Sequence, residues 1–552
     1  MEAVDICCSS EWANIGNTWV STPHDPRAVA RRINSTETMA ELSSVVSDLP
    51  PPFALITKHD SHVYCATDHL RSIPLYYRIE DDQVWVGNNV HELQTDCSTP
   101  VPSFRSQTEF LSTGYVHEDR TLYPEFNQVC ASELLAIDPS TGSVTSTTTD
   151  EYLVDPVSRS DGELRNKLIS TLDSVTKRLI QNADGRQLVV PLSGGYDSRL
   201  ILLLLIKHGY ENILTYSHGQ AGNAETETAR TVAKNLGVDW INVTYRPEHW
   251  RALVRSDEYD RYLETAFNGD RLPGIVHMNW LAVKGLTDRG LVEDDCLFLP
   301  GHTAATMAEH LPAEYEAETA IGCDRVIEDL FEMNFWLWDF ETELAETCKA
   351  WLRDQLSIEN EQLSPTAAAT VYERWEWLER ESKWIHADLD IYRYFDVGYR
   401  VPLWDREFFE FWQTVPMEHR IDKRLLTSYT DELYARYGDV DESKVGATER
   451  DSVVRQGYYA LRDSPLFKLI RPVNSYLRYR KDPSGWPAVL PEEVFSTIYT
   501  GNENRHSFFA LEMLNLLDFK RGEPTLVPTD GTLTSAFVER SRFVGNSLES
   551  RK

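Results

Sequence analysis

Apolar and polar residues alternate over several short stretches in the first part of the chain. Residues 53–57, 62–66, 74–78 and 83–87 follow this two-residue period, and turn-forming residues separate them. Such a pattern is typical of half-buried β-strands. Residues 138–149 add a Pro/Gly turn and a threonine-rich return strand, and residues 155–162 have the composition of a linker. The pattern predicts a β-rich N-terminal domain over residues 1–158.

Strand and helix patterns alternate after this linker. Helical periodicity over 163–182 is followed by a buried strand (187–191), a helix (198–209), a strand (212–216), a helix (225–236) and a strand (239–244). Connections of this length predict right-handed βαβ units and a parallel sheet. From about residue 324 the pattern becomes helical and rich in tryptophan, and we expect these aromatic side chains in the core. We assign residues 159–480 to this α/β domain and 481–552 to a C-terminal extension.

The most specific motif lies where the buried strand 187–191 ends and the next helix begins. It reads Leu192-Ser193-Gly194-Gly195-Tyr196-Asp197-Ser198. The two glycines let the backbone approach a phosphate, the serine hydroxyls add donors, and the helix N-terminus adds its dipole. Asp197 offers a carboxylate to Mg²⁺, and no lysine follows the glycines as it would in a Walker A loop. The motif predicts a phosphate-binding loop; an ordinary strand-to-helix turn is the alternative.

The chain is strongly acidic, with 54 basic and 87 acidic residues and a net charge of −33. Nucleic acids and anionic membranes both require a basic footprint, so the charge argues against either partner. Only 14 of the basic residues are lysines, a composition that resembles proteins of halophilic cytoplasms; an ordinary acidic cytosolic enzyme is the alternative. An aromatic content of 11% and a hydrophobic content of 41% exclude a disordered acidic chain.

Cysteines and apolar runs give no sign of a disulfide framework, a zinc site or a membrane anchor. The eight cysteines are scattered and form no C-x-x-C pair. No secretory signal opens the sequence, and the longest aliphatic run, 200–206, is much shorter than a bilayer span. We expect a soluble, cytoplasmic protein.

Together these motifs resemble the glutamine-dependent asparagine synthetases and their relatives, among them the β-lactam-forming synthetases, over roughly residues 50–460. The loop fits the family's ATP loop, and Tyr216 and Ser217 fall where its second strand presents a loop to adenine. Residues 399–405 look like the family's Arg-Val-Pro-Phe-Leu-Asp element, and Lys423-Arg-Leu-Leu426 follows at a similar distance. The resemblance implies an adenine nucleotide alpha-hydrolase-like synthetase domain, with ATP and Mg²⁺ as cofactors.

In this family a carboxylate is first adenylated, with release of pyrophosphate, and an amine then displaces AMP. A site for this chemistry must neutralise pyrophosphate and the charge that develops at the α-phosphorus. The resemblance assigns residues 192–198, Tyr216, Ser217 and Gly301 to nucleotide binding and Asp197 to Mg²⁺. It assigns Lys444 to the α-phosphate as the catalytic residue; an exposed loop lysine is the alternative for that position.

The N-terminal domain resembles the family's Ntn-type glutamine amidotransferase domain in its strands only. The family's nucleophile is a cysteine exposed at position 2, and this chain has Glu2 there. Cys7 or Cys8 would serve only after removal of a leader, and the Gly-Ile that follows the family's cysteine is missing. We expect an inactive glutaminase in which these cysteines are small hydrophobic residues.

Two departures concern the synthetase half. Where the family carries an acidic Gly-x-Gly-x-Asp-Glu loop, residues 297–307 contain no carboxylate, and the first one is Glu309. The glutamate that precedes the family's Arg-Val-Pro element is replaced by Gly398. The sequence therefore leaves metal binding and acceptor recognition open, and asparagine need not be the product.

The sequence favours an AMP-forming, ATP-dependent carbon–nitrogen ligase that joins a small-molecule carboxylate to ammonia or another amine, without its own glutaminase. One alternative is a non-catalytic descendant that binds a nucleotide or a partner protein. Another is amidation of a sugar carboxylate in surface-glycan assembly. The sequence fixes neither the acceptor nor the amine donor, and it leaves a homodimer open.

Overall fold

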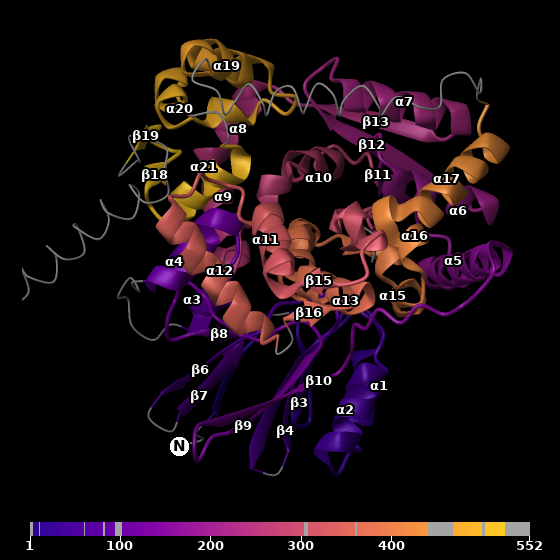
Figure 1. The fold of residues 1–552 in the computed structure, drawn as a ribbon, viewed down its shortest axis with the longest axis vertical. Coiled ribbons are helices and arrows are strands. Elements are labelled where there is room, and N and C mark those ends of the chain that lie inside the picture. Colours follow the sequence, from indigo (N-terminus) through magenta and orange to yellow (C-terminus); the bar gives the residue numbers. More distant parts are fainter. Residues whose placement is uncertain are drawn as a thin grey trace, which may run out of the picture.

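The computed structural model describes residues 4–9, 11–59, 61–80, 83–93, 102–302, 307–358, 361–439, 467–499 and 503–524. Two β-sheets at the bottom of the view carry the N-terminal part, and a parallel sheet with many helices makes up the remainder (Figure 1). No helix in these described segments is both long and apolar enough to cross a membrane.

The N-terminal part contains a four-stranded sheet in the order β1-β7-β6-β8 and a six-stranded sheet in the order β10-β9-β5-β4-β3-β2. Its strands are β1 (Val4–Cys7), β2 (Ala13–Ile15), β3 (Thr18–Ser21), β4 (Ala54–His59), β5 (His62–Thr67), β6 (Tyr76–Glu80), β7 (Gln83–Gly87), β8 (Asn127–Gln128), β9 (Glu133–Asp138) and β10 (Ser143–Thr148). The strands predicted at 53–57, 62–66, 74–78 and 83–87 are confirmed as β4, β5, β6 and β7, with ends shifted by up to two residues.

Apolar side chains pack on both faces of each sheet, because successive residues of a strand point to opposite faces, while the edge strand β10 is exposed. Ile56 of β4 and Val86 of β7 share the core between the two sheets. Leu55, on the other face of β4, packs with helices α1 (Pro26–Asn34) and α2 (Met39–Ser47). Tyr76 of β6 packs outward with Val90 of α3 (Val90–Leu93). The prediction of a β-rich N-terminal part is therefore confirmed, whereas its likeness to the Ntn-type fold stays a prediction.

A five-stranded parallel sheet in the order β13-β12-β11-β14-β17 organises the second part. Its strands are β11 (Leu188–Pro191), β12 (Ile213–Gly219), β13 (Asp239–Thr244), β14 (Leu297–Phe298) and β17 (Gly398–Tyr399). The helices along this stretch are α5 (Asp161–Ala183), α6 (Tyr196–Lys207), α7 (Ala224–Leu236), α8 (Pro247–Val254), α9 (Asp257–Ala266), η1 (Gly274–His277) and α10 (Trp280–Thr287). The predicted parallel sheet is confirmed. Helix α5 begins two residues earlier than expected because Ser160 caps it in a capping box with Glu163.

The strand order creates a topological switch point between β11 and β14. From β11 the chain moves through β12 to β13 on one side, and β14 and β17 lie on the other side. Because such crossovers are right-handed, their connections lie on opposite faces of the sheet and leave a crevice at the carboxyl ends of β11 and β14. Ligands of open α/β sheets bind in this crevice.

Helices dominate the chain after residue 306. They are η2 (Met307–His310), η3 (Ala313–Glu316), α11 (Cys323–Asn334), α12 (Thr342–Leu356), α13 (Pro365–Trp375), the π-helix η4 (Glu376–Trp384), η5 (Ile385–Asp388), α14 (Leu389–Tyr394), η6 (Pro402–Trp404), α15 (Arg406–Gln413), α16 (Met417–Arg420), η7 (Ile421–Lys423) and α17 (Arg424–Tyr437). Trp338, Trp375 and Trp377 are buried, which confirms the expected core role of these aromatics, while Trp336 is 39% exposed.

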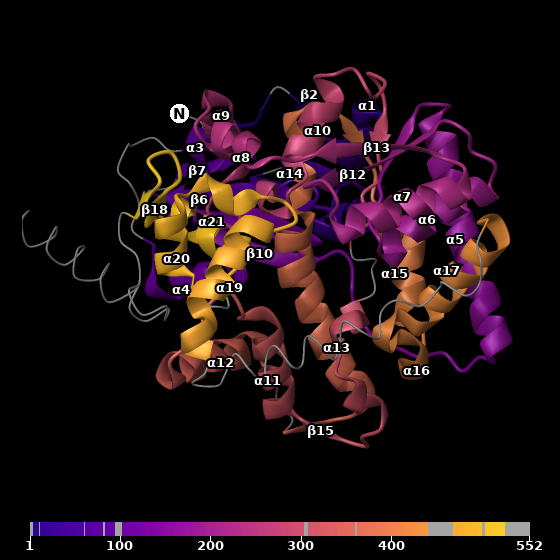
Figure 2. The ribbon, with the colours of Figure 1, turned by 90° about the horizontal axis from the view of Figure 1, so that it is seen from above.

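The C-terminal helices pack on the α/β part rather than projecting from it. They are α19 (Phe467–Lys481), η9 (Trp486–Val489), α20 (Glu492–Ile498) and α21 (Arg505–Met513). Trp486 and Phe508 belong to the same hydrophobic core as Val190 of β11. Seen from above, α19, α20 and α21 lie on the side opposite α5 and α17 (Figure 2). Two small antiparallel sheets complete the fold: β15 (Ile321–Gly322) with β16 (Gln362–Leu363), and β18 (Leu517–Asp518) with β19 (Glu523–Pro524).

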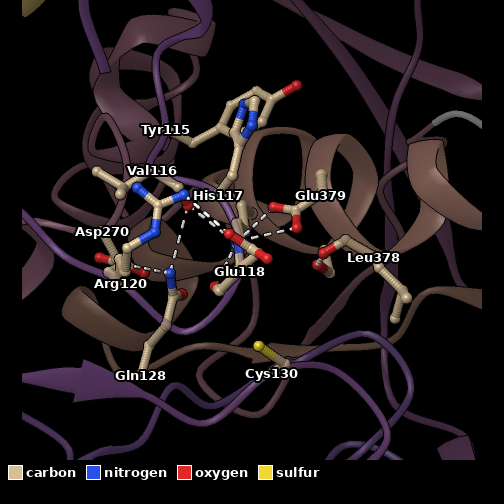
Figure 3. A network of polar contacts seen from close by, with 12 residues as sticks. Tyr115, Val116, His117, Glu118, Arg120, Gln128, Cys130, Asp270, Leu378 and Glu379 are labelled. Atoms are coloured by element: carbon tan, nitrogen blue, oxygen red, sulfur yellow. Dashed lines mark hydrogen bonds and ion pairs between the residues drawn. The ribbon is translucent and has the colours of Figure 1, made fainter. Parts of the chain in front are cut away.

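A buried polar network fixes the N-terminal part to η4. The chain segment 115–120, after helix α4 (Phe104–Thr113), runs beside η4, where Glu379 faces Glu118 (Figure 3). Lys383 Nζ donates to Val116 O at 2.9 Å, to Glu118 O at 2.8 Å and to Glu379 Oε2 at 2.5 Å. Burial alone would raise the pKa of Glu379, but Lys383 and His117 hold that pKa below its usual value.

Candidate active site

A cavity of about 300 Å³ opens at the switch point of the parallel sheet. Three strand ends contribute to it: β11 through Ser193 and Ser198, β12 through His218, and β14 through Gly301 and His302. Pro191 of β11 and Pro300 after β14 also line it. The remaining wall comes from other segments and consists of His277, Asn279, Ile385 and Asp388. The loop predicted to bind phosphate therefore faces a cavity at the place where such sheets bind ligands.

Serine hydroxyls determine the shape of the 193–198 loop. Ser198 Oγ accepts a hydrogen bond from the Ser193 amide at 3.2 Å and lies 3.1 Å from Ser193 Oγ. Ser193 Oγ in turn accepts a hydrogen bond from the Gly195 amide at 3.0 Å. Gly195 is the N-cap of α6 and provides no side-chain cap. The first-turn amides of α6 are therefore left for a ligand, and the helix dipole favours an anion there.

Two glycines allow neighbouring segments to approach this loop closely. A Cβ at Gly301 would lie 2.7 Å from the Ser198 amide nitrogen, and a Cβ at Gly194 would lie 3.1 Å from Thr228 Cγ2. Real Cβ atoms are essentially never found as close as the first of these distances. Gly301 thus lets the loop after β14 pass against the first turn of α6, and it forms part of the cavity wall.

Lys423 links two carboxylates beside the loop. Its Nζ donates to Asp197 Oδ2 at 2.9 Å and lies 2.5 Å from Glu309 Oε2. Burial raises the pKa of Asp197, and Lys423 opposes that rise. Burial alone would lower the pKa of Lys423, but the two carboxylates raise it. No function was predicted for Lys423, and Glu309 lies beyond the expected acidic loop in the sequence, yet the fold brings both close to Asp197.

The residues at this loop fit a Mg²⁺ ion that arrives with a phosphate ligand. Asp197 Oδ1 is buried and makes no hydrogen bond. Among the residues that the structure describes, no group of three His, Cys, Asp or Glu side chains could hold a metal ion. Mg²⁺ is commonly held by one or two carboxylates together with substrate phosphates. Asp197, with Glu309 on the far side of Lys423, offers that limited set.

Tyr216 and Ser217 lie at the expected strand end but turn into the protein. Tyr216 OH donates to Asn279 Oδ1 at 2.8 Å. Ser217 Oγ donates to Leu192 O at 2.6 Å and accepts from Trp240 Nε1 at 3.0 Å. These bonds join the ends of β11 and β12, and the next residue along β12 lines the cavity instead. Nucleotide contacts by Tyr216 and Ser217 stay a prediction.

Tyr196 and Arg199 support the loop from its outer side. Tyr196 OH donates to Asp431 Oδ2 of α17 at 3.3 Å, and Arg199 Nη2 donates to Gly194 O at 2.9 Å. The Arg199 guanidinium also lies over the ring of Tyr434, 5.1 Å from its centre. Helix α17 therefore steadies both ends of the loop. Lys444, the predicted catalytic lysine, lies outside the described residues, so its role stays a prediction.

Several polar residues of the cavity wall were not predicted from the sequence. His218 stacks on Tyr245 with ring centres 5.1 Å apart, and burial lowers its pKa to about 4. Burial likewise lowers the pKa of His277 to about 4. His302 Nε2 lies 3.2 Å from Asp388 Oδ2. His218 and His302 directly follow Ser217 and Gly301, which were predicted to bind nucleotide. Their position next to these residues was therefore the sequence signal that could have identified them.

Residues 170–286, which include the loop, α6, β12, α7 and β13, match the sequence profile of the asparagine synthase family. These residues therefore carry an asparagine synthase domain, which covers about a fifth of the chain. The resemblance drawn from the loop and from Tyr216 and Ser217 is therefore confirmed. The profile ends before β14, so the wall formed by Gly301, His302 and Asp388 lies outside the matched residues.

Similarity to individual proteins is weak. No curated protein sequence matches the chain significantly. One similar solved structure is the glutamine phosphoribosylpyrophosphate amidotransferase from B. subtilis complexed with ADP and GMP, at 12% identity and a TM-score of 0.16. The match covers 52% of this chain and 56% of that one, so the chain spans little more than half of its length. At this TM-score the likeness supports no conclusion about fold or ligand.

Gly398 and the N-terminal cysteines, where the chain departs from asparagine synthetases, have different structural settings. A Cβ at Gly398 in β17 would lie 2.5 Å from Leu297 Cδ2 and 3.2 Å from Cys296 O, so a glutamate there would require β14 to adjust. In the N-terminal part, Cys7 pairs with Gly87 of β7 inside a sheet. Burial, with added repulsion from Cys7, raises the pKa of Cys8 to about 12. A thiol with such a pKa is a poor nucleophile at neutral pH.

Proposed function

We propose that this protein is an ATP-dependent ligase that adenylates a small-molecule carboxylate, releases pyrophosphate and forms an amide with ammonia or another amine. The asparagine synthase domain at residues 170–286 supports ATP-dependent amidation in general. The observation that carries the proposal is the placement of the 193–198 loop, which opens into a 300 Å³ cavity at the switch point of the sheet. A loop that served only as a turn would not need a cavity in front of it.

The chain's own groups suit the first half-reaction. A carboxylate oxygen attacks the α-phosphorus of ATP, the bond to the β-phosphate oxygen breaks, and pyrophosphate leaves. The first-turn amides of α6 and the hydroxyls of Ser193 and Ser198 are placed to bind phosphate oxygens. The ammonium of Lys423 supplies positive charge beside them. Mg²⁺, held by Asp197 and Glu309, would neutralise further phosphate charge when bound, and Lys444 remains our candidate at the α-phosphate.

We propose that the amine comes from solution and not from glutamine bound to the N-terminal part. Cys7 is paired within a sheet, and burial raises the pKa of both Cys7 and Cys8. Neither thiol therefore has the exposed, activated setting of a nucleophile. Ammonia or a small amine would then reach the acyl-adenylate from solvent, attack its carbonyl carbon and displace AMP.

ATP–pyrophosphate exchange at high salt tests the adenylation step. A panel of amino-acid, dicarboxylic and sugar carboxylates would be offered to the wild type, to Asp197→Ala and to Asp239→Ala. Asp239 is an exposed aspartate at the opposite end of the same sheet and serves as the matched control. We expect exchange with one class of carboxylate, its loss in Asp197→Ala and its retention in Asp239→Ala.

Failure of wild-type exchange with every carboxylate, together with no ATP binding by calorimetry, would overturn the proposal. ATP binding without AMP release under any condition would instead select the non-catalytic alternative. Mass spectrometry of the products formed from ATP and a metabolite extract would identify the acceptor, since an adenylate or amide product carries its mass. A uronic-acid amide among the products would select the sugar-carboxylate alternative.

A further inference from the structure

A histidine and an aspartate form a pair on the wall of the cavity. His302 follows Gly301 after β14, and Asp388 ends η5, 86 residues later in the chain. His302 Nε2 lies 3.2 Å from Asp388 Oδ2. The same carboxylate oxygen accepts from Asn279 Nδ2 at 3.3 Å, and Asn279 Nδ2 also lies 2.9 Å from Tyr392 OH. Asp388 Oδ2 is therefore shared by His302 and Asn279, and Asn279 is tied in turn to Tyr392.

The pair fixes which ring nitrogen of His302 carries the proton. Because a carboxylate only accepts hydrogen bonds, Nε2 bears the hydrogen and Nδ1 keeps its lone pair. His302 Nδ1 is buried and makes no hydrogen bond. A buried nitrogen without a partner is costly, and both His302 and Asp388 line the cavity beside Ser193 and Ser198. His302 thus carries an acceptor nitrogen without a partner on a residue that lines the cavity.

The other histidines around the cavity do not combine a carboxylate partner with an unpartnered nitrogen; both ring nitrogens of His386 lack a hydrogen bond, but it has no carboxylate partner among the described residues. His277 Nε2 is bonded to Trp384 O at 2.9 Å, and the ring of His218 is stacked on Tyr245. The His386 ring packs beside His302 with centres 5.7 Å apart. Asp388 is the charged group that faces His302. The titratable neighbours of His302 are His386 of η5 and His277 of η1. Among these described groups, His302 alone pairs with a carboxylate and keeps a nitrogen for substrate.

We propose that His302 is the general base of the amide-forming step and that Asp388 is its positioning residue. This inference rests on the proposed function. In the step, the nitrogen of ammonia attacks the carbonyl carbon of the acyl-adenylate, a C–N bond forms, and the C–O bond to AMP breaks. The nitrogen loses one proton, which His302 Nδ1 accepts, and AMP leaves with the electron pair of the broken bond. The products are the amide, AMP and the protonated imidazole, which returns its proton to solvent.

A comparison of two nucleophiles isolates this role. Both nucleophiles lose one proton from nitrogen when they attack, but hydroxylamine is a much weaker base than ammonia. Its adduct therefore gives that proton to water more readily and depends less on a general base. The variants are His302→Gln and Asp388→Asn, with His208→Gln as the matched control. His208 Nε2 lies 2.9 Å from Asp173 Oδ1, so it forms a similar pair outside the cavity. ATP–pyrophosphate exchange and ATP calorimetry on each variant report folding and adenylation separately from amide formation.

We expect His302→Gln to form amide from ammonia about 100-fold more slowly, within the range of general-base catalysis. Its exchange rate and its hydroxamate formation should stay within a few-fold of the wild type. Asp388→Asn should show a smaller loss with ammonia and a displaced pH profile, because the tautomer and basicity of His302 then change. His208→Gln should behave as the wild type in every assay.

Two results would overturn the proposal while leaving the ligase intact. One is unchanged amide formation from ammonia in His302→Gln. The other is an equal loss with ammonia and hydroxylamine, which would make His302 a structural residue. Absence of exchange in the wild type would overturn the proposed function itself and this inference with it, so the two failures are distinguishable.

Discussion

Replacing Lys383 tests how strongly the N-terminal part is fixed to the rest of the molecule. This side chain is buried in η4, and its ammonium contacts two backbone carbonyls, of Val116 and Glu118, and the carboxylate of Glu379. Lys383→Met keeps the length of the side chain and its packing but removes the charge and all three hydrogen bonds. The change leaves Glu379 as a buried carboxylate without its lysine.

We expect the variant to lose about 3–5 kcal/mol of stability, the usual cost of breaking a buried ion pair on one side. The two carbonyls that lose their donor place the effect at the upper end of this range. Glu379 keeps the Glu118 amide at 2.9 Å and Gln355 Nε2 at 2.6 Å as donors, which limits the penalty. A loss of this size is a large fraction of the roughly 5–15 kcal/mol that stabilises a domain.

Denaturant unfolding at fixed high salt measures the effect, with Lys284→Met as the matched control. The Lys284 side chain is 31% exposed and pairs with Glu258 and Asp288 at the surface. Exposed pairs contribute about 0–1 kcal/mol, so this variant should unfold close to the wild type. Hydrogen exchange of residues 115–120 should accelerate in Lys383→Met and remain unchanged in Lys284→Met.

The pH dependence provides a second test of the same reasoning. Without Lys383, burial should raise the pKa of Glu379 above its unfolded value, so the penalty is present at high pH and is relieved as the pH falls through the folded pKa. The double variant Lys383→Met/Glu379→Gln should recover part of the lost stability, since no charge is left buried. Equal unfolding midpoints for Lys383→Met and Lys284→Met, at every pH, would refute the argument.

Four further predictions concern the cavity and the N-terminal cysteines. Gly301→Ala should abolish the ATP binding measured by calorimetry and lower the folding stability by about 1–3 kcal/mol, because its Cβ meets the Ser198 amide. Gly162→Ala, with open space around its Cβ, should change neither ATP binding nor stability. Lys423→Met should weaken ATP binding at least tenfold while Lys284→Met does not, and equal affinities would contradict the role of Lys423. Burial lowers the folded pKa of His218 and His277 to about 4, below an unfolded value of about 6.5. The free energy of unfolding should therefore fall as the pH drops from 6.5 to 4, by up to about 1.4 kcal/mol per pH unit for each of the two histidines. A free energy of unfolding that stays constant over this range would contradict the prediction. Glutamine should not replace ammonia as the amine donor, and Cys8→Ala should leave amide formation unchanged. Glutaminase activity in the wild type that is lost in Cys8→Ala would show instead that Cys8 is a nucleophile.

Local features of the fold could be predicted from the sequence because they depend on neighbouring residues. The 193–198 loop is determined by glycines, serines and a buried strand that are contiguous in the chain. Strand β14 and strand β17 are only two residues long, and no periodicity marks segments of that length. The reversal of strand order at β11, which depends on them, was therefore not predictable from the pattern.

The remaining site residues could not be placed because the fold, and not the sequence, brings them together. Lys423 and Asp197 are 226 residues apart, and His302 and Asp388 are 86 residues apart. Their proximity depends on how η7 and η5 pack over the carboxyl ends of the strands. The sequence nevertheless contained a weak signal, since Lys423 and His302 each lie in or beside an element with a family resemblance.

The shared lysine changes what the missing acidic loop implies. From the sequence, Asp197 was the single carboxylate at the expected place, and metal binding was open. In the fold, Glu309 approaches the same Lys423 from the other side, so two carboxylates and one ammonium lie beside the loop. ATP phosphates would compete for that ammonium, since the more densely charged anion attracts it more strongly at equal distance. Release of Asp197 and Glu309 from Lys423 would then accompany ATP binding and leave both carboxylates free for a cation. The ion pairs seen here therefore suit a nucleotide site in its ligand-free state.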